Sequence, residues 1–222
     1  MLCGRYTLTV DGKTLKDFFQ IDLEGFDFKP RYNIAPGQSV PVVCGNPDNK
    51  KIFLMRWGLI PEWSKKLSIG YKMINARAET IDKKPAFRNS FYNRRCLIPA
   101  DGFYEWKKEN SKKLPVRIIL PDKKIFAFAG IWDCWASTDG SKIFSFSIIT
   151  TSANDYIKDI HERMPVILAE IDQQNKWLGL NETDKLKNLL KPYDGDIFAY
   201  KVSTLVNFPK NDNPHCIKKL KD

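Results

Sequence analysis

Short segments in which apolar and polar residues alternate recur along the whole sequence, and they constrain the fold more than any other feature. In residues 5–10 (RYTLTV), for example, Tyr6, Leu8 and Val10 fall on one face of an extended chain. Turn-forming residues separate many of these segments, which predicts short β-strands. The predicted strands cover residues 5–10, 41–44, 51–57, 71–78, 102–108, 115–120, 126–132, 142–149, 165–169 and 196–203.

Helical patterns are few and short. They cover residues 14–19, 80–87, 152–160 (with Ser152 as a candidate N-cap), 171–179 and 182–190. Because strands and helices do not alternate regularly, the pattern lacks the rhythm of a parallel βαβ sheet. It predicts a β-rich α+β fold with short helices. No repeat, low-complexity segment or linker interrupts the chain, so we expect a single domain over residues 1–222.

The composition indicates a folded protein that does not enter a membrane. A chain of 222 residues can bury a sizeable core, and no apolar run approaches the roughly 18 residues that a membrane span needs. The first residues lack the basic and apolar regions of a secretory signal. The five cysteines include no Cys-x-x-Cys pair, which favours reduced thiols over disulfides or a zinc site. We therefore expect a soluble, cytoplasmic protein without metal or cofactor.

The charge distribution suggests an anionic partner. The formal net charge is +10, and the lysines are scattered as on a solvated surface. All arginines except Arg117 lie in or beside a few short stretches that also carry aromatic and other polar residues. Because the planar guanidinium group suits phosphate oxygens, clustered arginines favour a phosphodiester ligand. This pattern predicts nucleic acid as the partner.

Cys3 lies two residues from the amino terminus and is followed by glycine and arginine. A cysteine at the terminus itself carries a thiol and an α-amine on adjacent carbons, and this pair can trap an aldehyde. An internal cysteine offers the thiol alone. Cys3 therefore suits aldehyde chemistry only if Met1 and Leu2 are absent from the active protein.

Three further stretches carry polar residues that suit a catalytic or binding site. Period-two geometry places Asn75, Arg77 and Glu79 on one face of a predicted strand, either as a ligand site or as a solvent-facing surface. Glu105 lies between two large aromatic residues, where desolvation would raise the pKa of a catalytic carboxyl; it is otherwise a strand-edge glutamate beside the core. His161 precedes a proline-started strand and is either catalytic or structural.

His215, the other histidine, has no predicted role. Neither histidine has a suitably spaced Cys or second His, so we expect no metal site.

Taken together, six stretches resemble the SOS-response-associated peptidase (SRAP) family. They are CGRYTL, RYNIAPGQ, RWGLIPEW, NARAET, RCLIPADGFYEW and HERMPVIL, in this order over nearly the whole chain. The resemblance implies a β-rich SRAP fold with a positively charged groove that leads to a catalytic cysteine. It also implies covalent shielding of abasic sites in single-stranded DNA.

The resemblance also assigns residues to roles. The implied catalytic residues are Cys3, Asn75, Glu105 and His161, and the implied DNA contacts are Arg5, Arg77, Thr150 and Arg163. An α-amine on Cys3 would attack the aldehyde of a ring-opened abasic sugar, and the thiol would close the imine into a thiazolidine. Glu105 would move protons, Asn75 would orient the sugar or the amine, and His161 would aid ring opening and adduct release.

The family places its cysteine directly after the initiator Met, whereas Leu2 intervenes in this sequence. We expect Met1 and Leu2 to be removed, with the chain itself as a candidate for the cleavage. The expected partner is single-stranded DNA with abasic sites, bound by a monomer that associates with the nucleoid.

Two alternatives stay open. One is a cysteine peptidase that uses Cys3 with His161 as its base. The other is a non-catalytic reader of damaged or modified DNA, which would leave no heat-stable protein–DNA adduct.

Overall fold

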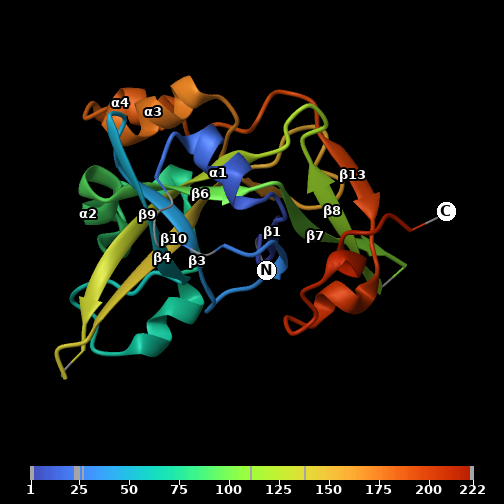
Figure 1. The fold of residues 1–222 in the computed structure, drawn as a ribbon, viewed down its shortest axis with the longest axis horizontal. Coiled ribbons are helices and arrows are strands. Elements are labelled where there is room, and N and C mark those ends of the chain that lie inside the picture. The colour runs from blue at the N-terminus through green and yellow to red at the C-terminus, as the bar shows by residue number, and fades with distance from the viewer. Residues whose placement is uncertain (1–2, 23–25, 27, 111, 138, 221–222) are drawn as a thin grey trace.

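The computed structural model describes residues 3–22, 26, 28–110, 112–137 and 139–220, whose strands form two sheets (Figure 1). The smaller sheet has the order β13-β8-β7-β1-β2. Its strands are β1 (Tyr6–Leu8), β2 (Arg31–Ile34), β7 (Gly102–Glu109), β8 (Lys112–Ile119) and β13 (Phe198–Lys201). All pairings in this sheet are antiparallel.

The larger sheet closes on itself because β10 pairs with both β4 and β9. The pairings β10-β4, β4-β3, β3-β6, β6-β9 and β9-β10 form a ring, and β5, β11 and β12 attach to it. Its strands are β3 (Ser39–Asn46), β4 (Asn49–Trp57), β5 (Asn75–Arg77), β6 (Arg95–Ala100), β9 (Phe126–Ala136), β10 (Lys142–Ser152), β11 (Arg163–Pro165) and β12 (Ile167–Leu168). Ring closure removes free strand edges at the centre of the fold.

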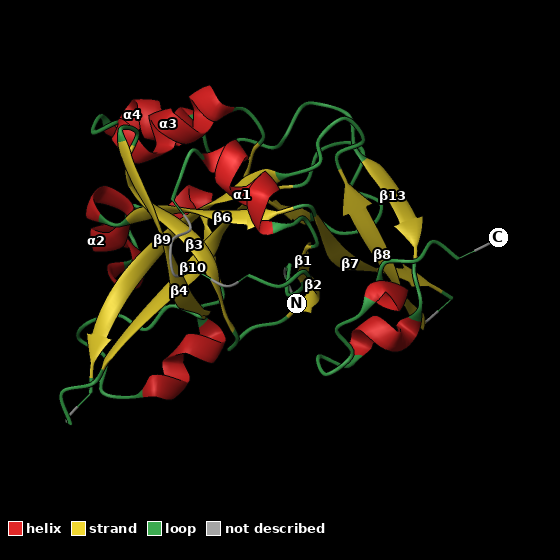
Figure 2. Cartoon of the chain, viewed as in Figure 1, coloured by secondary structure: helices red, strands yellow, loops and turns green. Residues whose placement is uncertain are grey.

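Short helices lie around the outside of the sheets (Figure 2). The α-helices are α1 (Gly12–Phe19), α2 (Pro85–Asn93), α3 (Ile171–Gly179) and α4 (Thr183–Asn188). The 3₁₀ helices are η1 (Leu67–Lys72), η2 (Ala78–Thr80), η3 (Thr204–Asn207) and η4 (Pro214–Cys216). Across the described ranges, none of the helices is long and apolar enough to cross a membrane.

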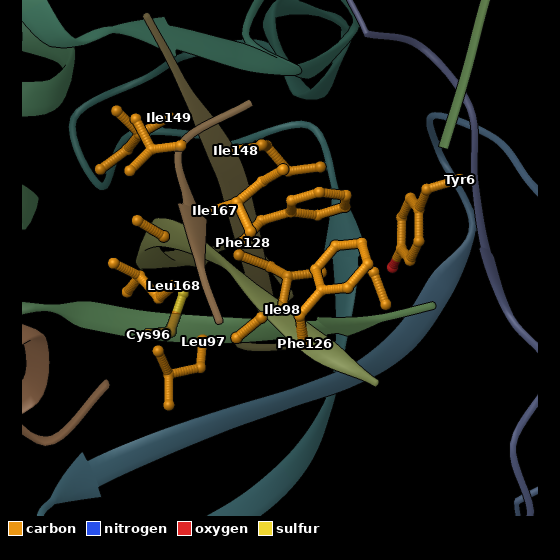
Figure 3. Packing of buried hydrophobic residues seen from close by; sticks show 14 of the residues in the cluster. Tyr6, Cys96, Leu97, Ile98, Phe126, Phe128, Ile148, Ile149, Ile167 and Leu168 are labelled. Atoms are coloured by element: carbon orange, nitrogen blue, oxygen red, sulfur yellow. The ribbon is translucent and has the colours of Figure 1, made fainter. Parts of the chain in front are cut away.

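Aromatic side chains from both sheets meet in the hydrophobic core. The Tyr6 ring of β1 packs edge-on against Trp57 and Phe128, with centroids 5.2 and 5.8 Å apart. Figure 3 shows Tyr6 beside the Phe126 and Phe128 rings of β9, with Ile98 of β6 beneath them. Burying such rings supplies the main driving force for folding, and it fixes β1 against the closed ring.

The predicted β-rich α+β fold is confirmed, with three corrections to individual elements. Residues 152–160 form turns rather than a helix, since Ser152 ends β10 and Asn154 Oδ1 accepts the Ile157 N–H at 3.1 Å. The predicted strand 71–78 shortens to β5, because η1 occupies residues 67–72. The predicted helix 80–87 begins only at Pro85, a residue suited to the first helical turn.

A buried polar network sets the register of β1 against β7. Thr7 pairs with Gly102, and the Thr7 hydroxyl donates to Asp101 Oδ1 at 2.5 Å. Arg117 of β8 donates to Thr7 Oγ1 at 3.1 Å and forms an ion pair with Asp101 at 3.4 Å. The Tyr104 N–H donates to the Arg5 carbonyl at 3.0 Å, which continues the pairing toward the amino terminus. This register brings Cys3 alongside Glu105.

Candidate active site

The candidate site residues come from both sheets, and β1 of the smaller sheet lies near the centre of the molecule, beside the larger sheet (Figure 1). Strand β10 holds one group, because Ile148 pairs with Asn75 and Thr150 pairs with Arg77 on its β5 side. On its other side Thr150 pairs with Pro165 of β11, directly after the HERM stretch. The β1–β7 pair holds Cys3, Arg5 and Glu105.

Cys3, Asn75 and Glu105 are brought together. The Asn75 side-chain amide donates to the Cys3 carbonyl at 3.2 Å, which joins β5 to the amino-terminal segment. The Cys3 backbone N–H hydrogen-bonds to the Glu105 carboxyl. A carboxyl therefore faces the nitrogen that would become an α-amine if Cys3 were the first residue.

The Glu105 carboxyl is poised to exchange protons near neutral pH. Glu105 is only 2% exposed, and its Oε1 atom has no hydrogen-bond partner in the described parts of the chain. Burial raises the pKa of Glu105 to about 8, despite backbone N–H groups of Cys3 and Trp106 that favour the ionised form. A carboxyl with this pKa can both accept and donate a proton under physiological conditions.

The Cys3 thiol and His161 do not form the ion pair of a thiol peptidase. Burial, and secondarily the negative charge of Glu105, raise the pKa of the Cys3 thiol well above its ordinary value. Partial burial lowers the pKa of His161, so the imidazole is neutral. No hydrogen bond joins the two side chains among the residues that the structure describes. A nucleophilic thiolate needs the opposite pKa shift.

A cavity of ≈ 540 Å³, which we call the Cys3 cavity, lies beside these residues. Gly4, the neighbour of the buried Cys3, lines it together with Glu105 and His161. His161 Nδ1 accepts the Arg163 N–H at 3.1 Å, so the proton of the neutral ring sits on Nε2. The lining also contains Arg5, Trp106, Lys108, Lys113, Ile160 and Asn207. Three cations and one carboxyl give the cavity a basic character.

Arg5 lines the Cys3 cavity, but its guanidinium group is largely held by protein acceptors. Nη1 donates to Asn33 Oδ1 at 2.8 Å and to the Val206 carbonyl at 2.5 Å, and Nη2 donates to the Asn207 carbonyl at 3.2 Å. The group also lies over the Trp106 ring, 5.9 Å from its centroid. Arg5 thus fixes residues 204–212, which we call the C-terminal wall, against the cavity.

Arg163 and Thr150 form a second polar group. Arg163 makes a bidentate ion pair with Glu79, at 2.5 and 3.0 Å, and donates to the Thr150 carbonyl at 2.7 Å. Glu79 lies in η2, beyond the end of β5, so the predicted Asn75–Arg77–Glu79 strand face is wrong at its third member. Arg77 is exposed. The Thr150 side chain is fully buried.

The C-terminal stretch STLVNFPKNDNP, residues 203–214, has no role predicted from the sequence. In the structure Asn33 of β2 holds this stretch, because its side-chain amide donates to the carbonyls of Val206, Phe208 and Asn211. Asn207 Oδ1 then accepts from the Trp106 indole at 2.7 Å. These contacts span most of the chain length, so no local sequence signal reveals them.

The raised pKa of Glu105 predicts a pH-dependent cost in folding stability. Because the carboxyl pKa is higher in the folded than in the unfolded chain, stability is lost as pH rises from about 4.5 to about 8. Glu105→Gln should remove this cost, so that the stability advantage of the variant over wild type grows by about 3 kcal/mol between about pH 6 and about pH 9. Urea unfolding at both pH values checks this. A constant difference between the two proteins would mean that the carboxyl is not desolvated.

The chain matches the family model described as SOS response associated peptidase (SRAP) over residues 2–209. The chain belongs to the SRAP family. It is 48% identical to abasic site processing protein YoaM of Bacillus subtilis over 218 residues, which cover 96% of each chain. It is 32% identical to abasic site processing protein HMCES of Xenopus tropicalis, over 86% of this chain and 66% of that protein.

SRAP membership agrees with the comparison to solved structures. A crystal structure of a protein from Bacteroides thetaiotaomicron has a TM-score of 0.89 and 28% sequence identity, and the match covers 99% of this chain and 100% of that chain. A second, from Bordetella bronchiseptica, has a TM-score of 0.79 at 27% identity, over 90% of this chain and 100% of that chain. The family resemblance drawn from the six sequence stretches is confirmed.

Proposed function

We propose that this SRAP protein senses abasic sites in single-stranded DNA and shields them by a covalent bond through Cys3. Its bacterial and vertebrate relatives are named abasic site processing proteins. The observation that carries the proposal is the buried Glu105 carboxyl, which faces the Cys3 backbone nitrogen beside a basic cavity. Incubation with single-stranded DNA that carries one abasic site, read on a denaturing gel, tests it. The same DNA with an intact base is the control.

The reaction joins three groups and releases one water. The α-amine of a terminal Cys3 attacks the C1′ aldehyde of the ring-opened sugar, and loss of water gives an imine. The Cys3 sulfur then adds to the imine carbon, and its proton passes to the nitrogen, which closes a five-membered thiazolidine. The amine has an ordinary pKa of about 7.7 to 8.0, so a useful fraction is neutral at physiological pH. Holding the amine and the thiol on one residue makes ring closure intramolecular.

Glu105 is the proton carrier in this scheme. It takes a proton from the attacking amine, returns it to the departing hydroxyl, and its position beside the Cys3 nitrogen suits both steps. The raised pKa of the Cys3 thiol keeps sulfur protonated, which favours attack by the amine first.

His161 and Asn75 assist the reaction of Cys3, the first by acting on the sugar and the second by orienting the amine. The Nε2–H of His161, on the cavity side of its bond to Arg163, can donate to the ring oxygen of the sugar as the ring opens. Asn75 holds the Cys3 carbonyl and so orients the amine. By microscopic reversibility His161 would also serve adduct release.

The amino terminus must be processed for this chemistry. Met1 and Leu2 lie outside the described residues. With Leu2 attached, the Cys3 nitrogen is an amide whose lone pair is delocalised, so it cannot form an imine. We propose that the chain removes both residues itself. The Cys3 sulfur attacks the Leu2 carbonyl while Glu105 takes the thiol proton and passes it to the Cys3 nitrogen, so that the Leu2–Cys3 C–N bond breaks and a thioester forms. Water then hydrolyses the thioester, which releases the Met-Leu dipeptide and leaves Cys3 with a free amine and thiol.

DNA phosphates meet cations at the rim of the site. We assign Arg77 to a phosphate contact, because its side chain is exposed beside the site, whereas Arg5 and Arg163 also hold the protein scaffold. The Thr150 carbonyl accepts a hydrogen bond from Arg163 and so helps to hold the Arg163 side chain in place.

Arg77→Ala should weaken binding to single-stranded DNA and lower its salt dependence. Each phosphate contact that is lost reduces the slope of log K against log salt by about 0.7 for single strands. Titrations at several salt concentrations measure this slope, and Arg88→Ala, an exposed arginine on α2, is the matched control. An unchanged slope in Arg77→Ala would place this residue off the DNA path.

A further inference from the structure

A second basic cavity adjoins the C-terminal wall, which also contributes to the Cys3 cavity. It has a volume of ≈ 380 Å³ and is lined by Ser203, Leu205, His215, Lys218, Lys219 and Leu220. The two cavities share η3, because Leu205 lines the second and Asn207 lines the first. In Figure 1 the red segment after β13 that carries both residues lies beside β8.

The second cavity carries positive charge that the protein does not neutralise. None of its described lining residues is acidic. Lys218 and Lys219 are exposed, and no ion pair ties either ammonium group to a carboxylate within the described residues. The Lys219 ammonium instead lies 5.5 Å from the centre of the Phe198 ring.

The C-terminal wall is held in place by side chains from distant parts of the sequence. Arg5 and Asn33 bind its backbone carbonyls, and Arg31 forms an ion pair with Asp212 at its far end. The Phe208 ring projects from this fixed segment and is 68% exposed, more than any other large apolar side chain that the structure describes. An exposed aromatic ring on the segment that contributes to both basic cavities suits a strand whose phosphates and bases need separate contacts.

We propose that the second cavity binds the phosphate backbone of single-stranded DNA on one side of the lesion, so that the strand crosses the C-terminal wall. This inference rests on the proposed function for the choice of ligand. Lys218 and Lys219 contact phosphates, and Phe208 stacks on a base where the strand crosses the wall. The DNA flank that occupies the cavity, 5′ or 3′ of the lesion, is the one whose shortening weakens binding.

The test uses DNA with a tetrahydrofuran abasic analogue, which has no aldehyde and therefore binds reversibly. Oligonucleotides of about 15 nucleotides, near the upper end of typical single-strand site sizes, carry the analogue at the centre or are shortened on the 5′ or the 3′ side. Wild-type protein should lose affinity when one of the two sides is shortened. In Lys218→Ala/Lys219→Ala the full-length DNA should bind about tenfold more weakly at low salt, and its salt slope should fall by about 1.4.

The double variant should also bind the full-length and the shortened DNA equally well. Lys65→Ala/Lys66→Ala removes the same charge from another exposed lysine pair and should keep the wild-type dependence on flank length. Phe208→Ala should weaken binding roughly tenfold without a change in salt slope. Retention of the wild-type flank dependence in the Lys218/Lys219 variant would overturn the inference, as would equal binding of all three DNAs by wild type. Failure of the proposed function would appear separately, as no adduct with true abasic DNA.

Discussion

Cys3→Ala is expected to abolish the heat-stable adduct between this protein and abasic single-stranded DNA. Alanine at this position has no sulfur, so the variant can neither remove Met1 and Leu2 by the proposed self-cleavage nor close the thiazolidine ring. Any imine formed by another amine of the protein would hydrolyse when the protein is denatured. A denaturing gel after heating should therefore show the adduct with wild type and none with the variant.

Cys134→Ala is the matched control, because this partly exposed cysteine lies on β9 and does not line the Cys3 cavity. It should give the wild-type yield. An adduct of unchanged yield and heat stability in Cys3→Ala would rule out the thiazolidine and direct attention to a lysine imine.

Glu105→Gln is expected to slow adduct formation by roughly 10²- to 10⁴-fold, the usual contribution of general acid–base catalysis. Glutamine preserves the size of the side chain and can occupy the same buried position, but it cannot carry a proton. Adduct yield followed over time at saturating DNA gives the rate. Because the same change should stabilise the fold at high pH, a slow variant that is also more stable cannot owe its rate loss to unfolding.

Glu109→Gln on the same strand is a suitable control, since Glu109 pairs with Lys107 and Lys201 and does not line the Cys3 cavity. Its rate should match wild type. A Glu105→Gln rate within about twofold of wild type would leave the carboxyl without a catalytic role, since acid–base catalysis contributes far more.

Period-two alternation predicted most strands of the fold because one face of each strand packs into the core. Tyr6 and Leu8 of β1 illustrate this, since both are buried in the hydrophobic core, whereas Thr7 between them is buried in the polar network with Asp101 and Arg117. The same signal misled at residues 71–78, because a short apolar–polar alternation also fits a 3₁₀ turn such as η1. Ring closure through β10 was not predictable, since it depends on the parallel pairing of β10 with β4, which lies far earlier in the chain.

Part of the candidate site was predicted from the immediate sequence neighbours of its residues, and the effect of these neighbours is also present in the folded chain. Glu105 stood out because aromatic neighbours flank it, and in the structure burial does raise its pKa. The environment of the predicted arginines was not visible in the sequence. Arg5 holds carbonyls about two hundred residues away, and Arg163 binds Glu79. Such side-chain partners follow from tertiary packing, which no local pattern encodes.

The intact mass of the adduct shows whether the active chain begins at Cys3 and closes a thiazolidine. Protein purified without an amino-terminal tag is incubated with abasic single-stranded DNA, and the denatured adduct is weighed by mass spectrometry. We expect a mass equal to that of a chain that begins at Cys3 plus that of the DNA, less the mass of one water molecule. An adduct that retains Met1 and Leu2, or the absence of any adduct, would contradict a thiazolidine at Cys3.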